Sequence, residues 1–276
     1  MQNIQWFPGH MAKAKRLISE KLRLADLIVE IIDARIPVSS RNLDILSEIK
    51  KKPRIIVLNK CDLADSTATN DWALSLGSKG DTVFFSDCKL GRGLDGFTTA
   101  VRKLMATDNK KRMRAVVCGI PNVGKSSFIN KMIKKRKAKV ENKPAVTRGV
   151  GWFRTKYDID FLDTPGVLWP KFEDPDIGRN LAIVGSIRHN VFDSEMLALC
   201  LIEILIKHYK IPFEKRFNVD FSACLDASEV LLTIGKKRGA LMSGGVINKK
   251  RAADIILEEF RSAKVGRITL EKCNNG

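Results

Sequence analysis

The sequence predicts an α/β protein: a mostly parallel sheet with helices on both faces, followed by an all-helical domain. Three observations support this. Short runs of branched apolar residues alternate with helical patterns up to about residue 165. Several of these runs are too uniformly apolar to have a solvent-exposed face. From residue 176 onward only helical periodicity remains, so we expect one domain over 1–175 and a second, helical domain over 176–276.

The expected elements follow one another regularly along the chain. An amphipathic basic helix over 12–24 comes first. The expected strands are 28–32, 54–58, 83–85, 115–118 and 159–162, and the helices between them are 42–50, 96–105 and 125–133. In the second domain we expect helices over 194–209, 226–234 and 249–260.

The composition excludes several classes of protein. The chain has 276 residues, 49 Lys and Arg against 31 Asp and Glu, a formal net charge of +18, and 44% hydrophobic residues. That apolar share is enough for a packed core, and the positive surplus favours a polyanionic partner. The longest apolar run, 196–206, is too short for a membrane span, which needs roughly 20 residues. We therefore expect no stable membrane association. Since the six cysteines form no C-x-x-C pair, we expect neither zinc nor disulfides, and a cytoplasmic protein.

A phosphate-binding loop is the first motif that carries chemistry. Residues 119–126 read G-x-x-x-x-G-K-S between an expected strand and an expected helix, which is the context that this motif requires. The glycines let backbone amides surround phosphate oxygens, Lys125 reaches the β- and γ-phosphates, and the Ser126 hydroxyl can ligate Mg²⁺. We expect Lys125 to be catalytic, and we expect phosphate contacts from Asn122, Val123, Gly124, Lys125, Ser126 and Ser127.

The loop after the second expected strand selects the base. It reads N-K-x-D, and the carboxylate of Asp62 can accept two hydrogen bonds from guanine N1–H and N2–H₂. Adenine would leave that carboxylate unpaired, which argues against an ATP-using kinase. Lys60 can lay its stem along the purine, and Asn59 can tie this loop to the phosphate loop. The expected guanine-binding residues here are Asn59, Lys60, Cys61 and Asp62.

A D-x-x-G motif follows the last expected strand of the sheet. In this motif Asp163 would hold Mg²⁺ through water, and the amide of Gly166 would contact the γ-phosphate. Thr147 lies in the loop between the phosphate loop and this strand, where a threonine completes the metal shell. We therefore expect Mg²⁺ at Ser126, Thr147 and Asp163, with Thr147 and Gly166 also contributing to catalysis.

The order of the motifs along the chain is unusual. The loop after the third expected strand would contact guanine O6 through the amide of Asp87 or Cys88. The order along the chain is thus base loop (G4), O6 loop (G5), phosphate loop (G1), the loop with Thr147 (G2) and D-x-x-G (G3). Both base-contacting loops precede the phosphate loop, which gives the order G4-G5-G1-G2-G3. Because an ordinary GTPase begins with the phosphate loop, the sequence predicts a circularly permuted P-loop GTPase domain. The D-x-x-G switch then leads directly into the helical domain.

The chain resembles a known family over essentially its whole length. The resemblance rests on the permuted motifs together with Trp6-Phe-Pro-Gly-His-Met11, Asp33-Ala-Arg-Ile-Pro37, Leu162-Asp-Thr-Pro-Gly166, Gly235-Lys-Lys-Arg-Gly239 and Gly266-Arg-Ile-Thr-Leu-Glu271. These segments are similar to the ribosome biogenesis GTPase A (YlqF/RbgA) family. The resemblance implies hydrolysis of GTP to GDP and phosphate in late assembly of the large (50S) ribosomal subunit, with ribosomal RNA as the partner. The O6 loop departs from the commoner Ser-Ser or Ser-Ala form, so only its backbone contact is carried over.

The group that orients the attacking water is open. Val167 stands where a Ras-type GTPase has glutamine, and valine cannot hydrogen-bond to water. One candidate is His10, whose alternative role is a structural histidine packed beside Trp6 and Phe7. The other is a K⁺ ion, since Asn122 resembles the asparagine that helps to hold K⁺ in related GTPases.

The basic residues are concentrated in a few segments. Residues 131–148 hold eight Lys or Arg against one Glu. Such a run is usually a solvated face, but here it lies in a nucleotide-gated loop, which favours RNA contact. The expected RNA contacts are Lys134, Lys135, Lys137, Lys236, Lys237, Arg238, Lys249 and Lys250.

Two functions remain open at this point. The first is a monomeric, ribosome-stimulated GTPase that binds GTP or GDP with Mg²⁺. The second is a GTP-gated adaptor that binds a protein or membrane partner, with hydrolysis incidental. The sequence has no helix with both a bulky aromatic face and a basic face, which disfavours the membrane version of the adaptor.

Overall fold

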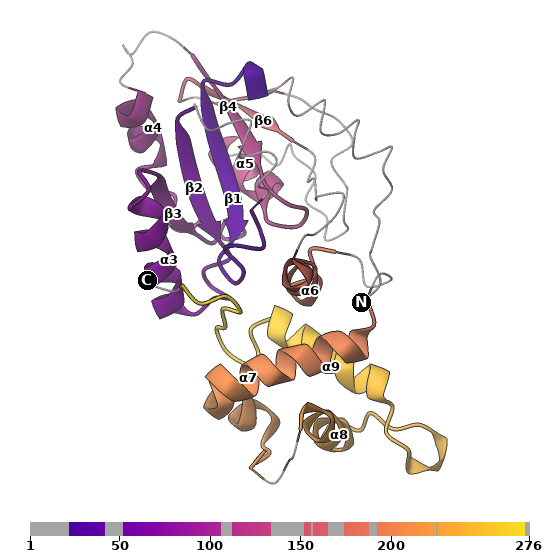
Figure 1. Cartoon of the computed structure of the whole chain (residues 1–276). Coiled ribbons are helices and arrows are strands. Elements are labelled where there is room, and N and C mark those ends of the chain that lie inside the picture. The colour runs from indigo at the N-terminus through magenta and orange to yellow at the C-terminus, as the bar shows by residue number, and fades with distance from the viewer. Residues whose placement is uncertain are drawn as a thin grey trace.

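A six-stranded sheet is the central layer of the first half of the chain (Figure 1). The computed structural model describes residues 22–41, 52–105, 112–133, 152–155, 157–164, 174–187, 192–222, 224 and 226–273. The strands are β1 (Leu27–Asp33), β2 (Arg54–Asn59), β3 (Thr82–Ser86), β4 (Met113–Cys118), β5 (Trp152–Arg154) and β6 (Ile159–Asp163). Their order is β3-β2-β1-β4-β6-β5, and all neighbours are parallel except β5, which runs antiparallel to β6.

Helices cover both faces of this sheet, as the uniformly apolar strands predict. Every residue of β1 is buried, and its side chains alternate between the two faces. Leu27, Val29 and Ile31 pack with α4 (Phe97–Met105) and α5 (Lys125–Ile133). Ile32 lies in a separate core cluster with residues of α3 (Ser66–Gly77).

An aromatic cluster fixes α4 and α5 against the sheet. The ring of Phe97 lies 5.2 Å from that of Phe128 and 5.4 Å from that of Phe84. The rings of Phe128 and Phe161 are 5.5 Å apart and almost perpendicular. Edge-to-face pairs of this kind add to the stabilisation from burial alone. The cluster therefore holds α5, the helix that follows the phosphate loop, in a defined place on the sheet.

The second half of the chain is helical. Its elements are α6 (Pro175–Ile183), α7 (Ser194–Phe217), α8 (Ala227–Lys237), the short 3₁₀ helix η2 (Ser243–Gly245) and α9 (Lys249–Arg261). Each α-helix begins after an Asp or Asn whose side chain accepts a backbone N–H of the first turn, which is a strong start signal. These capping residues are Asp174, Asp193, Asp226 and Asn248.

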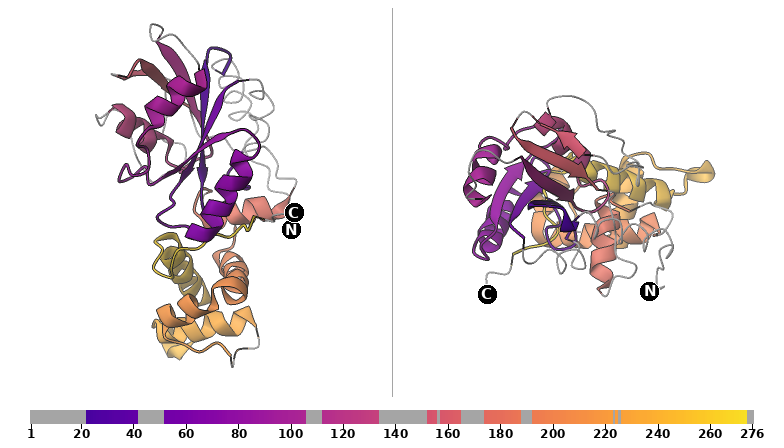
Figure 2. Two further views of the ribbon diagram at one scale, coloured as in Figure 1. Left: turned by 90° about the vertical axis from the view of Figure 1, so that its left-hand side faces the viewer. Right: turned by 90° about the horizontal axis from the view of Figure 1, so that it is seen from above.

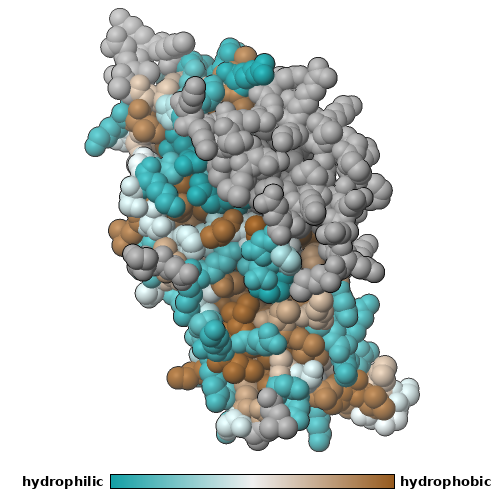
Figure 3. All heavy atoms as spheres, in the orientation of Figure 1, coloured by the Kyte–Doolittle hydropathy of each residue, from teal (hydrophilic) through white to brown (hydrophobic). Residues whose placement is uncertain are grey.

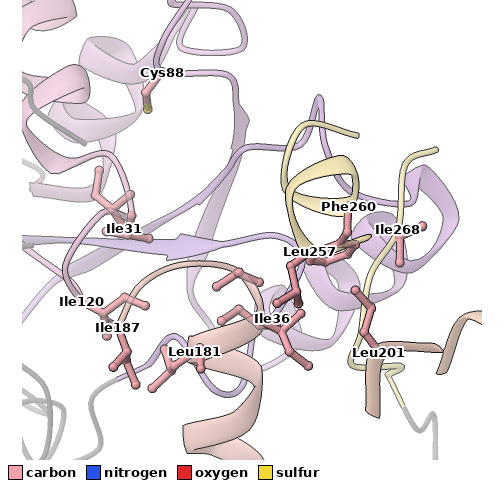
Figure 4. Packing of buried hydrophobic residues seen from close by; sticks show 14 of the residues in the cluster. Ile31, Ile36, Cys88, Ile120, Leu181, Ile187, Leu201, Leu257, Phe260 and Ile268 are labelled. Carbon is pink, nitrogen blue, oxygen red and sulfur yellow. The ribbon is translucent and has the colours of Figure 1, made fainter. Parts of the chain in front are cut away.

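The sheet and the helices share one hydrophobic core. The strands point with their carboxyl ends toward α7, α8 and α9 in Figure 1 and in the left view of Figure 2. In Figure 4, Ile36 from the loop after β1 lies near Leu181 of α6 and Leu257 and Phe260 of α9. Because the core is continuous, the division at residue 175 stays a prediction. No helix in the described ranges is long and apolar enough to cross a membrane.

The structure adds four elements that the sequence pattern did not indicate. These are the three-residue edge strand β5, the polar helix α3, the short helix α6 and the 3₁₀ helix η2. In addition, α7 continues beyond the expected end at Tyr209, where the backbone is locally non-helical (φ −141°). Pro212 explains this break, since it lacks an N–H and its ring crowds the preceding turn. The expected helix over 42–50 lies outside the described residues, as does that over 12–24 apart from its last three residues.

The aromatic cluster gives a stability prediction. Phe97 is 1% exposed, so Phe97→Ala opens a cavity and is expected to lower the free energy of unfolding by about 3–5 kcal/mol. Urea denaturation measures this loss. The matched control is Leu74→Ala on α3, a side chain that is 73% exposed, for which we expect a change of about 0.5 kcal/mol or less. Similar losses in the two variants would contradict the assigned packing.

Candidate functional site at the carboxyl edge of the sheet

Five polar or small residues end the parallel strands at one edge of the sheet. Since β1, β2, β3, β4 and β6 run parallel, their carboxyl ends meet there, where ligands bind in open α/β sheets. The expected base loop, O6 loop, phosphate loop and D-x-x-G motif each follow one of these strands. The terminal residues are Asp33, Asn59, Ser86, Cys118 and Asp163.

The side chain of Asn59 joins three of these loops. Its Nδ2 donates to the carbonyl oxygen of Val123 in the phosphate loop (2.6 Å), and its Oδ1 accepts the backbone N–H of Cys88 in the O6 loop (2.9 Å). Asn59 is only 3% exposed, so both polar ends of its amide need partners inside the protein. The expectation that Asn59 ties the base loop to the phosphate loop is confirmed.

Gly124 makes this junction possible. An added Cβ at residue 124 would lie 2.2 Å from Nδ2 of Asn59, and the backbone φ there is +106°. Both facts exclude a larger residue, because glycine alone combines that backbone conformation with an absent side chain. The second glycine of the phosphate loop therefore leaves room for the Asn59 amide of the base loop.

The phosphate loop places a cation beside a hydroxyl and a carboxylate. Nζ of Lys125 donates to the carbonyl oxygens of Gly119 (3.1 Å) and Ile120 (2.8 Å), and burial lowers the pKa of this lysine to about 8. The Ser126 hydroxyl donates to Oδ2 of Asp163 at 3.0 Å. Burial raises the pKa of Asp163, while Lys125 and Ser126 oppose that rise. The three side chains thus form one electrostatically coupled group.

The Asp163 carboxylate has one buried oxygen in need of a partner. Its Oδ1 has no hydrogen-bond partner among the described residues. Oxygen ligands from carboxylate and hydroxyl groups are those that Mg²⁺ prefers, usually together with water and phosphate oxygens. The Ser126 and Asp163 pair therefore fits a magnesium ion at this position.

A buried ion network supports the base loop from beneath. Asp33 at the end of β1 pairs with Arg35, through bonds of 2.9 and 2.8 Å, and with Nζ of Lys60 at 2.9 Å. Burial alone would raise the pKa of Asp33, but the two cations outweigh it and hold the pKa well below its usual range. Lys60 itself has a left-handed backbone (φ +62°). The lysine of the N-K-x-D loop is thus fixed by a carboxylate of the neighbouring strand.

The Asp62 carboxylate lies at the exposed rim of the same loop. Desolvation and the charge of the buried Asp87 raise the pKa of Asp62, while Arg35 and Arg267 oppose that rise. Oδ1 of Asp87 accepts the backbone N–H of Leu90 at 3.0 Å, which shapes the O6 loop. The base loop and the O6 loop therefore bring two carboxylates near each other, next to arginine side chains.

Asn122 connects the phosphate loop to the helical half. Its Nδ2 donates to the carbonyl oxygen of Gly185, just after α6, at 3.1 Å, and its backbone is left-handed (φ +57°). This contact leaves the amide oxygen as the atom of Asn122 suited to a cation.

Several predicted site residues lie outside the described part of the chain, namely His10, Lys134, Lys135, Lys137, Thr147 and Gly166.

Sequence reasoning gave no role to two residues that the structure places at this site. Asp33 holds Lys60 of the base loop, and Glu271 binds the backbone of the loop that follows β1. Both lie in segments noted only for their resemblance to a family. For Asp33 the sequence did offer a signal, because an acidic residue at the end of a buried parallel strand lies at the edge of the sheet where ligands bind.

Comparison with known proteins agrees with this geometry. Residues 114–212 match the family model described as 50S ribosome-binding GTPase. The chain is 40% identical to Ribosome biogenesis GTPase A of Bacillus cereus, over 97% of this chain and 93% of that protein. It is also similar to GNP-bound YlqF from T. maritima (TM-score 0.66, 28% identity, 94% of this chain and 98% of that one). A GDP-bound structure of TM YlqF gives a TM-score of 0.70 at 28% identity, over 94% and 100% of the two chains.

The fold and the order of its loops define a circularly permuted P-loop GTPase, an enzyme that binds guanine nucleotides. The predicted α/β fold class is confirmed. The chain belongs to the ribosome biogenesis GTPase A family.

Gly124 gives a prediction with a matched control. Gly124→Ala is expected to weaken GTP binding by tenfold or more, because the new Cβ displaces Asn59 from the phosphate loop; this corresponds to a loss of about 1.4 kcal/mol or more. Gly80→Ala is the control, since Gly80 has φ +84° with nothing within 4 Å of an added Cβ. Alanine at residue 80 also has a positive φ, which costs about 1–2 kcal/mol, but it meets no clash. Isothermal titration with GTP separates the two, and equal affinities would contradict the junction.

Proposed function

We propose that this chain hydrolyses GTP to GDP and phosphate on the large (50S) ribosomal subunit during late subunit assembly, as a cytoplasmic monomer that the subunit stimulates. The observation that carries the proposal is the convergence of the base loop, O6 loop and phosphate loop on Asn59. Its support from relatives is the 40% identity to Ribosome biogenesis GTPase A and the name of the matching family model.

The base loop and the O6 loop would bind guanine. The Asp62 carboxylate accepts guanine N1–H and N2–H₂, and the backbone N–H of Asp87 or Cys88 donates to O6. Asn59 fixes the two loops to each other, and its bond to the Cys88 amide supports their shared role. The proposed guanine site comprises Asn59, Lys60, Cys61, Asp62, Asp87 and Cys88.

The phosphate loop would bind the phosphates, with a magnesium ion at its edge. Lys125 turns from the loop carbonyls toward the β- and γ-phosphate oxygens, and the α5 N-terminus adds its positive dipole end. The proposed metal residues are Ser126, Thr147 and Asp163, with Asp163 bound through water. When bound, Mg²⁺ neutralises negative charge on the phosphates. The proposed phosphate contacts are Asn122, Val123, Gly124, Lys125, Ser126, Ser127 and Gly166.

Catalysis needs a group that orients water. We propose His10 for this role, together with Lys125, Thr147 and Gly166 around the γ-phosphate. The alternative to His10 is a K⁺ ion held by Asn122, which would supply positive charge beside the phosphates. The contact from Nδ2 of Asn122 to the Gly185 carbonyl supports a fixed orientation of this amide.

The helical half would contact ribosomal RNA through lysines. Lys236 and Lys237 at the end of α8, and Lys249 and Lys250 at the start of α9, are exposed. The loop between α8 and α9 carries three exposed apolar residues, Leu241, Met242 and Val246, and it shows brown at the lower right of Figure 3. Arg238 is a weaker candidate, because its guanidinium pairs with Glu259 (3.3 Å) and lies over the ring of Phe217. In the switch region the proposed contacts are Lys134, Lys135 and Lys137.

Base selection gives the first test. Asp62→Asn is expected to exchange guanine preference for xanthine preference, because the new amide donates where xanthine has a carbonyl oxygen. We expect GDP affinity to fall by about 100-fold and XDP affinity to exceed it, from the loss of two hydrogen bonds to a charged acceptor. Isothermal titration with both nucleotides measures this. Unchanged GDP affinity would remove Asp62 from the base site.

Salt dependence gives the second test. If the lysines contact RNA phosphates, binding to 50S subunits weakens steeply with salt, since each phosphate contact contributes roughly 0.7–0.9 to the log–log slope. Lys236→Ala with Lys250→Ala is therefore expected to lower the slope by about 1.5 in every nucleotide state. Subunit cosedimentation at graded salt measures it.

The control for that test is Lys79→Ala with Lys103→Ala, two exposed lysines that lie in the sheet half, shortly before β3 and β4 begin. This pair changes the net charge equally and is expected to leave the slope unaltered. Salt-insensitive association of the unmodified chain would contradict RNA contact and favour the adaptor that binds a protein partner.

A further inference from the structure

The chain returns from the helical half to the sheet after α9. Residues 268–271, here called the C-terminal strap, lie between the loop that follows β1 and the base loop that follows β2. Ile268 is fully buried and belongs to the shared core, where Figure 4 shows it near Phe260. The strap is therefore part of the folded protein, although it lies more than 200 residues from the base loop in the sequence.

Backbone hydrogen bonds join the strap to both loops. The N–H of Ile268 donates to the carbonyl oxygen of Leu63 at 3.1 Å, and the N–H of Leu270 donates to the carbonyl oxygen of Arg35 at 2.8 Å. Leu63 comes directly after the N-K-x-D residues 59–62, and Arg35 pairs with Asp33, the carboxylate that holds Lys60. The strap thus contacts the base loop directly and also its supporting ion network.

Side chains reinforce these contacts. Oγ1 of Thr269, which is 1% exposed, accepts the backbone N–H of Asp65 at 3.2 Å. Asp65 in turn caps α3, since its Oδ1 accepts the N–H groups of Thr67 and Ala68. The hydroxyl of Tyr209 in α7 lies 3.1 Å from Oδ2 of Asp65 and 3.3 Å from the backbone N of Thr269. The end of the base loop is therefore held by the strap and by α7 together.

Glu271 anchors the far end of the strap. Its carboxylate accepts the backbone N–H groups of Val38 (2.6 Å) and Ser39 (3.0 Å), and it accepts the side-chain amide of Asn180 in α6 (3.1 Å). Its carbonyl oxygen accepts Nε1–H of Trp72 in α3 at 2.8 Å. Glu271 is partly buried, and these bonds replace the water contacts that its carboxylate loses, so they fix where the strap lies.

We propose that the C-terminal strap positions the guanine-binding loop, so that base affinity and base selectivity depend on a segment of the helical half. This rests on the proposed guanine role of residues 59–62. Thr269 and Glu271 are the positioning residues. They act on Asp62 through the backbone of residues 63–65 and through the loop that carries Arg35, without contacting the nucleotide themselves.

The test compares strap variants in the full-length chain. Thr269→Val keeps the side-chain shape and removes the acceptor of the Asp65 N–H, and Glu271→Gln removes the anchoring charge. We expect each to weaken GDP binding about 5- to 10-fold, the size of effect for one or two misplaced hydrogen bonds. Inosine diphosphate lacks the guanine N2 amine, so the preference for GDP over inosine diphosphate is expected to fall about threefold or more.

The control is Arg216→Gln, which removes a bidentate bond to Glu259 within the helical half, away from the base loop. It is expected to lower thermal stability without altering the ratio of the two affinities, because that ratio does not depend on the fraction of folded protein. If Glu271→Gln fails to fold, Thr269→Val and Tyr209→Phe carry the test.

The outcomes separate this proposal from the base-loop assignment. Wild-type GDP affinity and selectivity in the strap variants, with Asp62→Asn switching to XDP, would overturn the role of the strap alone. Unchanged GDP affinity in Asp62→Asn would overturn the base-loop assignment and the strap proposal with it. A reduced preference for GDP in the strap variants but not in Arg216→Gln supports the proposal.

Discussion

The nucleotide site depends on the buried amide of Asn59. Three loops from three strands meet at this one side chain, and each end of its buried amide has one partner inside the protein. A buried donor or acceptor without a partner costs about 1–3 kcal/mol, so displacing any of the loops is unfavourable. Gly124 follows from the same constraint, because a side chain there would occupy the position of the amide. The positions of the base loop, the O6 loop and the phosphate loop relative to one another are thus set together.

Circular permutation changes what is connected to this site. In the permuted order the helical half follows D-x-x-G, and the structure shows that it also contacts the other loops. Asn122 of the phosphate loop donates to Gly185, just after α6, and within the helical half Arg261 of α9 donates to the carbonyl oxygens of Ala182 and Ile183 in α6. The strap contacts the base loop from the other side. The phosphate loop and the base loop are thus each joined to the helical half by hydrogen bonds.

Local patterns predicted most of the fold and the nucleotide loops. Buried parallel strands are continuous apolar runs, and the phosphate and base loops are contiguous motifs, so both can be recognised in the sequence. The edge strand β5 escaped because three residues with an antiparallel partner leave no periodicity. The helix α3 escaped because its sequence, STATNDWALSLG, is poor in strong helix formers and depends on the Asp65 cap. The role of Glu271 joins residues more than 230 positions apart, and no local pattern encodes that contact.

Three arginines and three lysines of the described ranges use their charge in different ways. Arg35, Arg216 and Arg261 make internal bonds with carboxylates or carbonyls, where a planar guanidinium can use several donors at once. In contrast, Lys236, Lys237 and Lys250 extend into solvent at the ends of α8 and α9. A lysine ammonium is a flexible point charge that can neutralise a phosphate without fixed geometry. These arginines therefore hold parts of the fold together, while the three exposed lysines are placed where a polyanion could reach them.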